Sequence, residues 1–188
     1  VDKKLLTNWN ALTGIALMQA GRWLGNPKLI LKAEKLFNQL LNRHYDQGKL
    51  YHSSNEGILQ KHEFLEDQAA ILLLATYLQE ETGEYQKQML KLRENLKKFY
   101  QDGWKSNRGN DFITMPADSF DHPSPSSVSL AEAALLRTAL LLDEDYPASE
   151  YQQAFSNDFY NLMAFFSQGN LHIIHSPVKL DFQQLPAN

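Results

Sequence analysis

The chain has 188 residues, no cysteine, 43% hydrophobic residues and 21% charged residues, which is typical of a globular protein. The lack of cysteine excludes disulfide scaffolds, thiolate metal sites and cysteine nucleophiles. The formal net charge of -4 provides no positive excess for binding phosphates, so we expect no nucleic-acid partner. No apolar run approaches the roughly 20 residues that span a bilayer, so we expect no membrane partner and a cytoplasmic location.

Apolar residues recur three and four positions apart through most of the chain, which predicts amphipathic helices. Gly25-Asn26-Pro27 is a strong stop and restart signal, and Thr82-Gly83 is a second short turn. Trp23 is expected in the core. The predicted helices span residues 8–24, 27–44, 64–81, 84–101, 126–142 and 148–167, and residues 171–188 are predicted to form an extended tail.

The helices pair into three predicted hairpins, 8–44, 64–101 and 126–167. Links inside a hairpin are short, whereas the two links between hairpins run to roughly 20 residues, which is unusual for a connection without a function. We expect short extended segments within these long links. If the hairpins pack side by side, the first helix of each begins at the same end of the molecule. We call this end, with its helix starts and long links, the rim.

Three polar clusters lie at the predicted helix starts of the rim. They are Thr7-Asn8-Trp9-Asn10, Glu63-Phe64-Leu65-Glu66-Asp67, and the Pro/Ser-rich segment 121–129. Helix capping alone accounts for Asn, Asp and Ser at such positions. Their convergence on one end, together with histidines in the long links, favours a functional site instead, and both interpretations remain open.

Three blocks in these clusters carry a resemblance to a known family. The blocks are Thr7-Asn8-Trp9-Asn10-Ala11-Leu12, Phe64-Leu65-Glu66-Asp67 and Asp121-x-x-x-Pro125-Ser126-x-x-Ser129. In order and spacing, residues 2–170 resemble the C-terminal helical region of the thioredoxin-domain proteins of the YyaL and spermatogenesis-associated type. The resemblance implies an all-α fold, about half of an (α/α)6 toroid akin to the six-hairpin glycosidases and the N-acylglucosamine 2-epimerases. It also implies that the chain, which starts at Val1, is a fragment whose partners are the missing half of the toroid and a thioredoxin-like domain.

The chain departs from the family pattern at three positions, Ala11, Gln68 and Val128. The family's asparagine at the last of these would offer an amide that valine lacks. These departures favour an alternative in which the region is a non-catalytic structural or protein-interaction module. A half-toroid would also expose an apolar flank, so we consider a homodimer as a further possibility.

A carbohydrate-processing site needs an acid, a base and aromatic faces for the sugar ring. The candidate catalytic residues are Glu66, Asp67 and Asp121, and the candidate substrate-binding residues are Asn8, Trp9, Asn10, His52, His62, Ser126 and Ser129. Trp9, Trp104 and Tyr51 are candidate stacking residues. Glu66 and Asp67 lie about 100° apart around a helix, so at most one should point inward. In the epimerase relatives histidines transfer the protons, so both a glycosidase-like and an epimerase-like reaction stay open. No carboxylate–histidine set shares one helix face, so we expect neither a metal nor a cofactor.

Overall fold

The structure is a computed structural model that describes residues 3–108, 113–122 and 124–145. The helices in this part are α1 (Thr7–Trp23), α2 (Pro27–His44), α3 (Leu65–Thr82), α4 (Gln86–Lys97) and α5 (Ser127–Leu142). They confirm five of the predicted helices, although α4 is shorter than the predicted 84–101. The predicted helix 148–167 and the tail 171–188 lie outside the described residues.

Local signals explain the two tight helical turns. Gly25, between α1 and α2, has a φ of 59°, and Gly83, after α3, has a φ of 74°, a region that favours glycine. Asn26 then caps α2, because its side-chain oxygen accepts a hydrogen bond from the N–H of Lys28 at 3.1 Å. Pro27 takes the first helical position, where its missing N–H has no cost.

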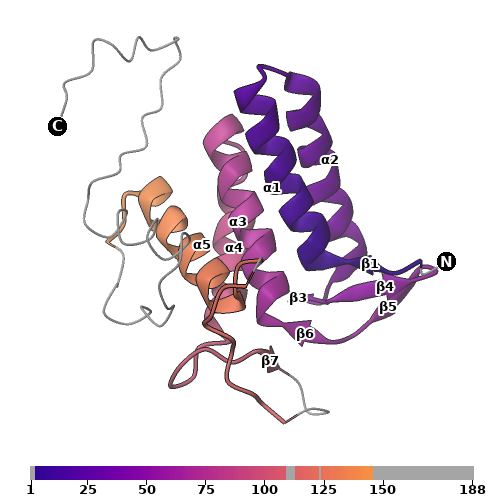
Figure 1. Ribbon diagram of the computed structural model, residues 1–188, viewed down its shortest axis with the longest axis vertical. Coiled ribbons are helices and arrows are strands. Elements are labelled where there is room, and N and C mark those ends of the chain that lie inside the picture. The colour runs from indigo at the N-terminus through magenta and orange to yellow at the C-terminus, as the bar shows by residue number, and fades with distance from the viewer. Residues whose placement is uncertain (1–2, 109–112, 123, 146–188) are drawn as a thin grey trace.

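The first helices of the hairpins run in the same direction, as predicted (Figure 1). Asn8, at the start of α1, contacts Asp67 at the start of α3, and Arg22 near the end of α1 binds Glu81 near the end of α3. Figure 1 shows α5 beside α3 in the same sense. All three helices therefore begin at the rim.

The expected all-α fold, half of an (α/α)6 toroid, is wrong, because the described residues also form short antiparallel strands in three small sheets. The strands are β1 (Leu5–Leu6), β2 (Tyr45–Asp46), β3 (Lys49–Leu50), β4 (Ser53–Asn55), β5 (Ile58–Gln60), β6 (Glu63–Phe64) and β7 (Asn107–Arg108). β4 lies between β1 and β5, β2 pairs with β3, and β6 pairs with β7. Strands of two or three residues show almost no alternating pattern, so the sequence analysis treated them as extended pieces of loop.

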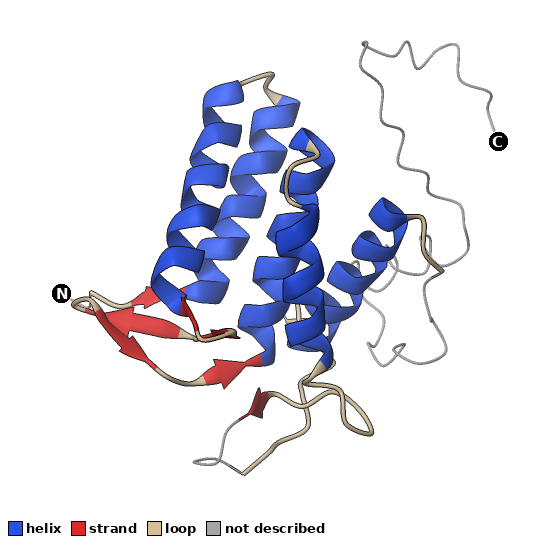
Figure 2. Cartoon of the chain, turned by 180° about the vertical axis from the view of Figure 1, so that it is seen from behind, coloured by secondary structure: helices blue, strands red, loops and turns tan. Residues whose placement is uncertain are grey.

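Two of the strand pairs are closed by tight turns, Gln47-Gly48 and Glu56-Gly57. Both residues of each turn have positive φ, as two-residue type I′ hairpin turns require. Figure 2 shows the strands gathered at one end of the helices, the end at which α1 and α3 begin. The described parts of the long links therefore contribute a layer of small sheets that supports the rim.

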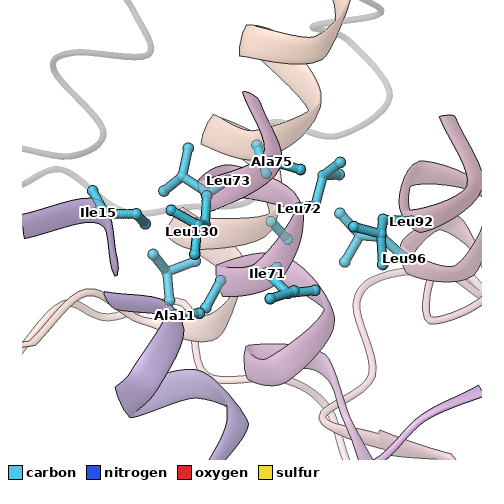
Figure 3. Packing of buried hydrophobic residues seen from close by; sticks show 14 of the residues in the cluster. Ala11, Ile15, Ile71, Leu72, Leu73, Ala75, Leu92, Leu96 and Leu130 are labelled. Atoms are coloured by element: carbon cyan, nitrogen blue, oxygen red, sulfur yellow. The ribbon is translucent and has the colours of Figure 1, made fainter. Parts of the chain in front are cut away.

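α3 is the central helix of the core. Its side chains from residue 69 to residue 75 are all buried. Figure 3 shows Leu73 on the side of Ile15 of α1, and Leu72 on the side of Leu92 of α4. A helix that is apolar all round needs neighbours all round, and α1, α4 and α5 provide them. Within the described ranges, no helix is both long and apolar enough to cross a membrane.

α1 exposes a tryptophan at each end. Trp23 is 90% exposed, so its predicted place in the core is wrong, and Trp9 is 69% exposed. Between them, Gly14 permits close packing of α1 on α3, since a Cβ there would lie 2.6 Å from a methyl carbon of Leu74. The two indoles are thus separated by the whole length of a tightly packed helix.

Candidate functional site

Asn8, His52 and Asp67 meet where α1 and α3 begin. The side chain of Asp67 is 0% exposed, and its two oxygens have different partners. Oδ1 accepts a hydrogen bond from the main-chain N–H of Asn8 at 3.0 Å, and Oδ2 lies 2.9 Å from Nδ1 of His52. An ionised carboxylate only accepts, so Nδ1 carries the proton. We call Asn8, His52, Glu66 and Asp67 the Asp67 centre.

His52 lies between β3 and β4, and hydrogen bonds hold its main chain on both sides. The N–H of Thr7 donates to the carbonyl of His52, and the N–H of His52 donates to the carbonyl of His62, both at 2.8 Å. The ring of His52 packs edge-on against Phe64, with 5.0 Å between centroids. Its side chain is 23% exposed, and Nε2 makes no hydrogen bond to any described residue. Nε2 is therefore the nitrogen available to a ligand.

The hydrogen bond changes the acidity of both partners. Burial raises the pKa of Asp67 to about 6, although the bond from His52 opposes that shift. The bond to Asp67 raises the pKa of His52 above its ordinary value, although burial opposes it. Both changes make the pair keep a proton to higher pH than the separate groups would.

Glu66 is the exposed neighbour of this pair. Its side chain is 43% exposed, and Oε1 lies 3.9 Å from Nδ1 of His52. Asp67, one residue on, is buried, which confirms the expectation that only one of the two carboxylates points inward. Glu66 thus adds an exposed carboxylate on the solvent side of the Asp67 centre.

Within the described part of the chain, His52, Glu66 and Asp67 also form a group that could hold a cation. Their ligand atoms all lie within 4.8 Å of one another. The sequence analysis missed this group because its histidine and its carboxylates come from different segments. The bond between His52 and Asp67 already uses two of these atoms, so a cation would have to displace the shared proton. The hydrogen bond between His52 and Asp67 by itself explains why the ligand atoms of these two residues lie so close together.

The remaining predicted residues of α1 point in different directions. The N–H of Trp9 donates to the side-chain oxygen of Asn8 at 2.8 Å, and its indole is exposed to solvent. The amide of Asn10 donates to the carbonyl of Leu6 at 2.7 Å and lines a cavity of about 180 Å³ that is bordered by α2. Trp9 therefore has an exposed ring that can stack on a ligand, whereas Asn10 is held by the main chain.

His62 packs against Phe64, the ring that also contacts His52. Its ring is tilted against the Phe64 ring, with 6.5 Å between centroids, and its main chain binds that of His52. These contacts place His62 beside the Asp67 centre, where it supports the segment that carries His52.

Asp121, Ser126 and Ser129 form the N-terminal cap of α5. The side-chain oxygen of Ser126 accepts a hydrogen bond from the N–H of Ser129 at 3.1 Å, and its hydroxyl donates to that of Ser129 at 3.0 Å. Oδ1 of Asp121 accepts from the N–H of Ser126 at 2.7 Å. In the described part of the chain, no hydrogen bond or ion pair joins these residues to the Asp67 centre. Their observed contacts are those of a helix cap.

The other predicted stacking residues, Trp104 and Tyr51, are both buried and cannot face a ligand. Ala11 and Val128, two departures from the family pattern, are buried in the hydrophobic core. The amide of Gln68, the third departure, donates to the carbonyl of Leu50 at 2.9 Å. None of these residues belongs to the solvent-facing part of the Asp67 centre.

A second buried polar cluster adjoins the centre and was missed by the sequence analysis as a site. It consists of Thr7, His44 and Ser54, joined by hydrogen bonds of 2.7 and 2.9 Å. One signal for it existed: His44 continues the buried face of α2 that includes Phe37 and Leu40. A histidine on an apolar helix face needs partners, and here other segments supply them.

No protein-family model matches the chain, and no curated protein matches it either. The chemistry of the Asp67 centre is therefore the basis for a functional proposal.

Proposed function

We propose that the Asp67 centre binds a sugar or sugar-like ligand and transfers protons to and from it, with His52 as the acid and base. The observation that supports this proposal is the hydrogen bond from Nδ1–H of His52 to the buried carboxylate of Asp67. A carboxylate at Nδ1 orients the imidazole and stabilises the imidazolium that forms when Nε2 takes a proton. The accessible Nε2 is the atom that such a mechanism requires.

The reaction class that fits this arrangement is proton exchange at a carbon next to a carbonyl group. Neutral His52 takes the proton at Nε2, and the electron pair of the C–H bond moves through the carbon to the carbonyl oxygen, which gives an enolate. Return of that proton from His52 restores the substrate. Return of a solvent proton to the opposite face gives the epimer, and His52 then releases its proton to solvent. The step balances without a redox partner.

Glycosidase chemistry fits these residues less well, because it needs two carboxyl groups that flank the scissile bond. Asp67 is buried and Asp121 binds the main chain at the start of α5, which leaves Glu66 as the one candidate of the three without such a structural role. The epimerase-like alternative is therefore preferred.

Two features support a sugar as the ligand. Trp9 offers an exposed indole face next to Asn8, and indoles stack on the apolar faces of pyranose rings. The resemblance of residues 2–170 to the helical region of the YyaL and spermatogenesis-associated thioredoxin-domain proteins points to the same ligand class. Membership of that family, a thioredoxin-like domain and a further helical region as partners, and a cytoplasmic location belong to the same proposal.

The experiment is an isotope exchange assay. The chain is incubated in D2O with a panel of aldoses and N-acylhexosamines, and deuterium at the carbon next to the carbonyl is followed by proton NMR. We expect exchange with at least one sugar, loss of that exchange in His52→Gln, and unchanged exchange in the control His122→Gln, an exposed histidine near the start of α5. Absence of exchange and of binding across the panel would refute the proposal.

One observation favours the alternative, a non-catalytic module that binds protein. Trp23, Leu24 and Leu31 are all exposed around the turn between α1 and α2, where large apolar side chains are unusual on a free surface. A second copy of the chain is the simplest partner. Sedimentation velocity should then show a dimer that Trp23→Ala dissociates, and a concentration-independent monomer would remove this alternative.

A further inference from the structure

We propose that His44 and Thr7 are positioning residues that fix His52 for proton transfer, an inference that rests on the proposed function. Thr7 and His44 are both buried, and neither offers a group to solvent. Thr7 and His44 are hydrogen-bonded to each other, and both bind main-chain groups of Tyr51 or His52.

The bonds of Thr7 define the protonation of His44. The Thr7 hydroxyl donates its single proton to the carbonyl of Tyr51 at 2.6 Å. Its 2.7 Å bond with Nδ1 of His44 must therefore be donated by Nδ1–H. Nε2 of His44 then accepts from the hydroxyl of Ser54 at 2.9 Å. His44 is thus a neutral imidazole with its proton on Nδ1, and burial, which lowers its pKa, keeps it neutral.

Thr7 and His44 together hold the residue before His52 by both of its main-chain groups. The carbonyl of Tyr51 accepts from the Thr7 hydroxyl, and the N–H of Tyr51 donates to the carbonyl of His44 at 2.9 Å. The N–H of Thr7 in turn donates to the carbonyl of His52 at 2.8 Å. Three hydrogen bonds from two residues therefore set the main-chain path into His52.

The same turn of α1 also holds the other partner of the proton-transfer pair. Asn8 follows Thr7 directly, and its N–H binds Oδ1 of Asp67. Thr7 and Asn8 thus hold His52 and Asp67, the two ends of the 2.9 Å bond. Proton transfer depends on tenths of an ångström in such a bond, and buried networks with every polar group paired supply that precision.

The test measures the titration of the His52 imidazole by NMR, on the full chain and without any ligand. The groups that act on this ring electrostatically are Asp67, Glu66, Lys4 and His44. Thr7→Val removes the hydroxyl with almost no change in shape. We expect the pKa of His52 to fall toward its ordinary value, because the bond to Asp67 lengthens, and the exchange rate to fall by about 10-fold or more.

The conservative variant and a matched control separate positioning from general damage. Thr7→Ser keeps the hydroxyl and should restore the wild-type titration of His52. Thr138→Val removes another fully buried threonine hydroxyl, on α5, and should leave that titration unchanged. A Thr7→Val variant whose His52 titrates as in the wild type overturns the proposal.

Two further variants keep the test valid if Thr7→Val does not fold. Ser54→Ala removes the bond to Nε2 of His44, and His44→Asn keeps a donor near the position of Nδ1 while losing the Nε2 acceptor. Both should lower the pKa of His52 by less than Thr7→Val does, and an unchanged titration in both overturns the proposal. Failure of the proposed function appears separately, as absent deuterium exchange in the wild type.

Discussion

Asp67, on the first turn of α3, accepts a hydrogen bond from the main-chain N–H of Asn8, on the first turn of α1, at 3.0 Å. The other oxygen of the same carboxylate binds His52. One buried side chain therefore ties two parallel helices together and orients the proposed acid and base. Substitution of Asp67 should therefore change both the stability of the chain and the proposed proton exchange. Substitution of its neighbours should change one of these properties without the other.

Asp67→Asn should slow the proposed proton exchange by about 10²- to 10⁴-fold, because the imidazolium loses its counter-charge. It should also lower the free energy of unfolding by about 1–3 kcal/mol, since the amide cannot satisfy both buried donors as well. NMR exchange rates and urea unfolding measure the two effects. Glu66→Gln serves as the comparison: its side chain is 43% exposed and makes no hydrogen bond to His52, so it should change stability little and slow exchange far less than Asp67→Asn does. A wild-type exchange rate in Asp67→Asn would contradict the assigned role.

The contribution of the Asp67–His52 pair to stability should fall as pH rises. Folding raises the pKa of Asp67 from 3.8 to about 6, so the folded chain binds this proton more tightly and loses stability between those values. The raised pKa of His52 adds a further loss as pH rises through its folded value, above 6.5. Urea unfolding between about pH 4 and pH 8 should show this slope in the difference between the wild type and a His52→Gln, Asp67→Asn double variant, because that variant lacks both groups. A contribution of the pair to stability that rises with pH would contradict this prediction.

Glu80 joins the far ends of α1, α3 and α5, because its carboxylate pairs with Arg22 at 3.1 Å and with Arg137. Glu80→Gln should lower the free energy of unfolding by about 1–3 kcal/mol, since it leaves the mostly buried guanidinium of Arg137 without its counter-charge. Glu56→Gln removes an exposed ion pair with Lys3 and should change stability by about 0.5 kcal/mol or less. Chemical denaturation of both variants checks this, and equal effects would argue against a special role for Glu80.

Trp9→Ala should weaken binding of a responsive sugar by roughly 3- to 10-fold, the value of one stacking contact. Trp23→Ala is a matched control, because Trp23 is also exposed on α1 but lies at its opposite end. Its removal should leave sugar binding unchanged in isothermal titration calorimetry. If both substitutions weaken binding equally, the ligand does not contact Trp9.

Ser126→Ala should lower the free energy of unfolding by about 1 kcal/mol, because α5 loses its capping acceptor. The same variant should leave sugar binding and exchange intact, since the contacts of Ser126 are with Ser129 and Asp121. Thermal unfolding and the exchange assay together decide the point. A loss of exchange without a loss of stability would indicate that Ser126 belongs to the binding site.

The helices and their turns were predictable because their signals are local. Gly25, Pro27 and Gly83 act through backbone conformation, and apolar spacing acts through the helical period, so both can be read without knowing the neighbours. The parallel order of α1, α3 and α5 followed from short and long links. The strands of the rim were missed because pairing partners such as β1 and β4 lie far apart in sequence and each carries only two or three residues.

Residue types at the rim were also evident from the sequence, which identified Asn8, His52, Glu66 and Asp67 as candidates. Tertiary packing determined which role each of these residues has. Asn8 and Asp67 are 59 positions apart, and Asp67 and His52 are 15 apart, so the packing of α1 and of the segment between β3 and β4 against the start of α3 joins them. Burial of one carboxylate, exposure of its neighbour and the neutral state of His44 all depend on groups from other segments, because solvation and hydrogen bonding are properties of the assembled surroundings of a side chain.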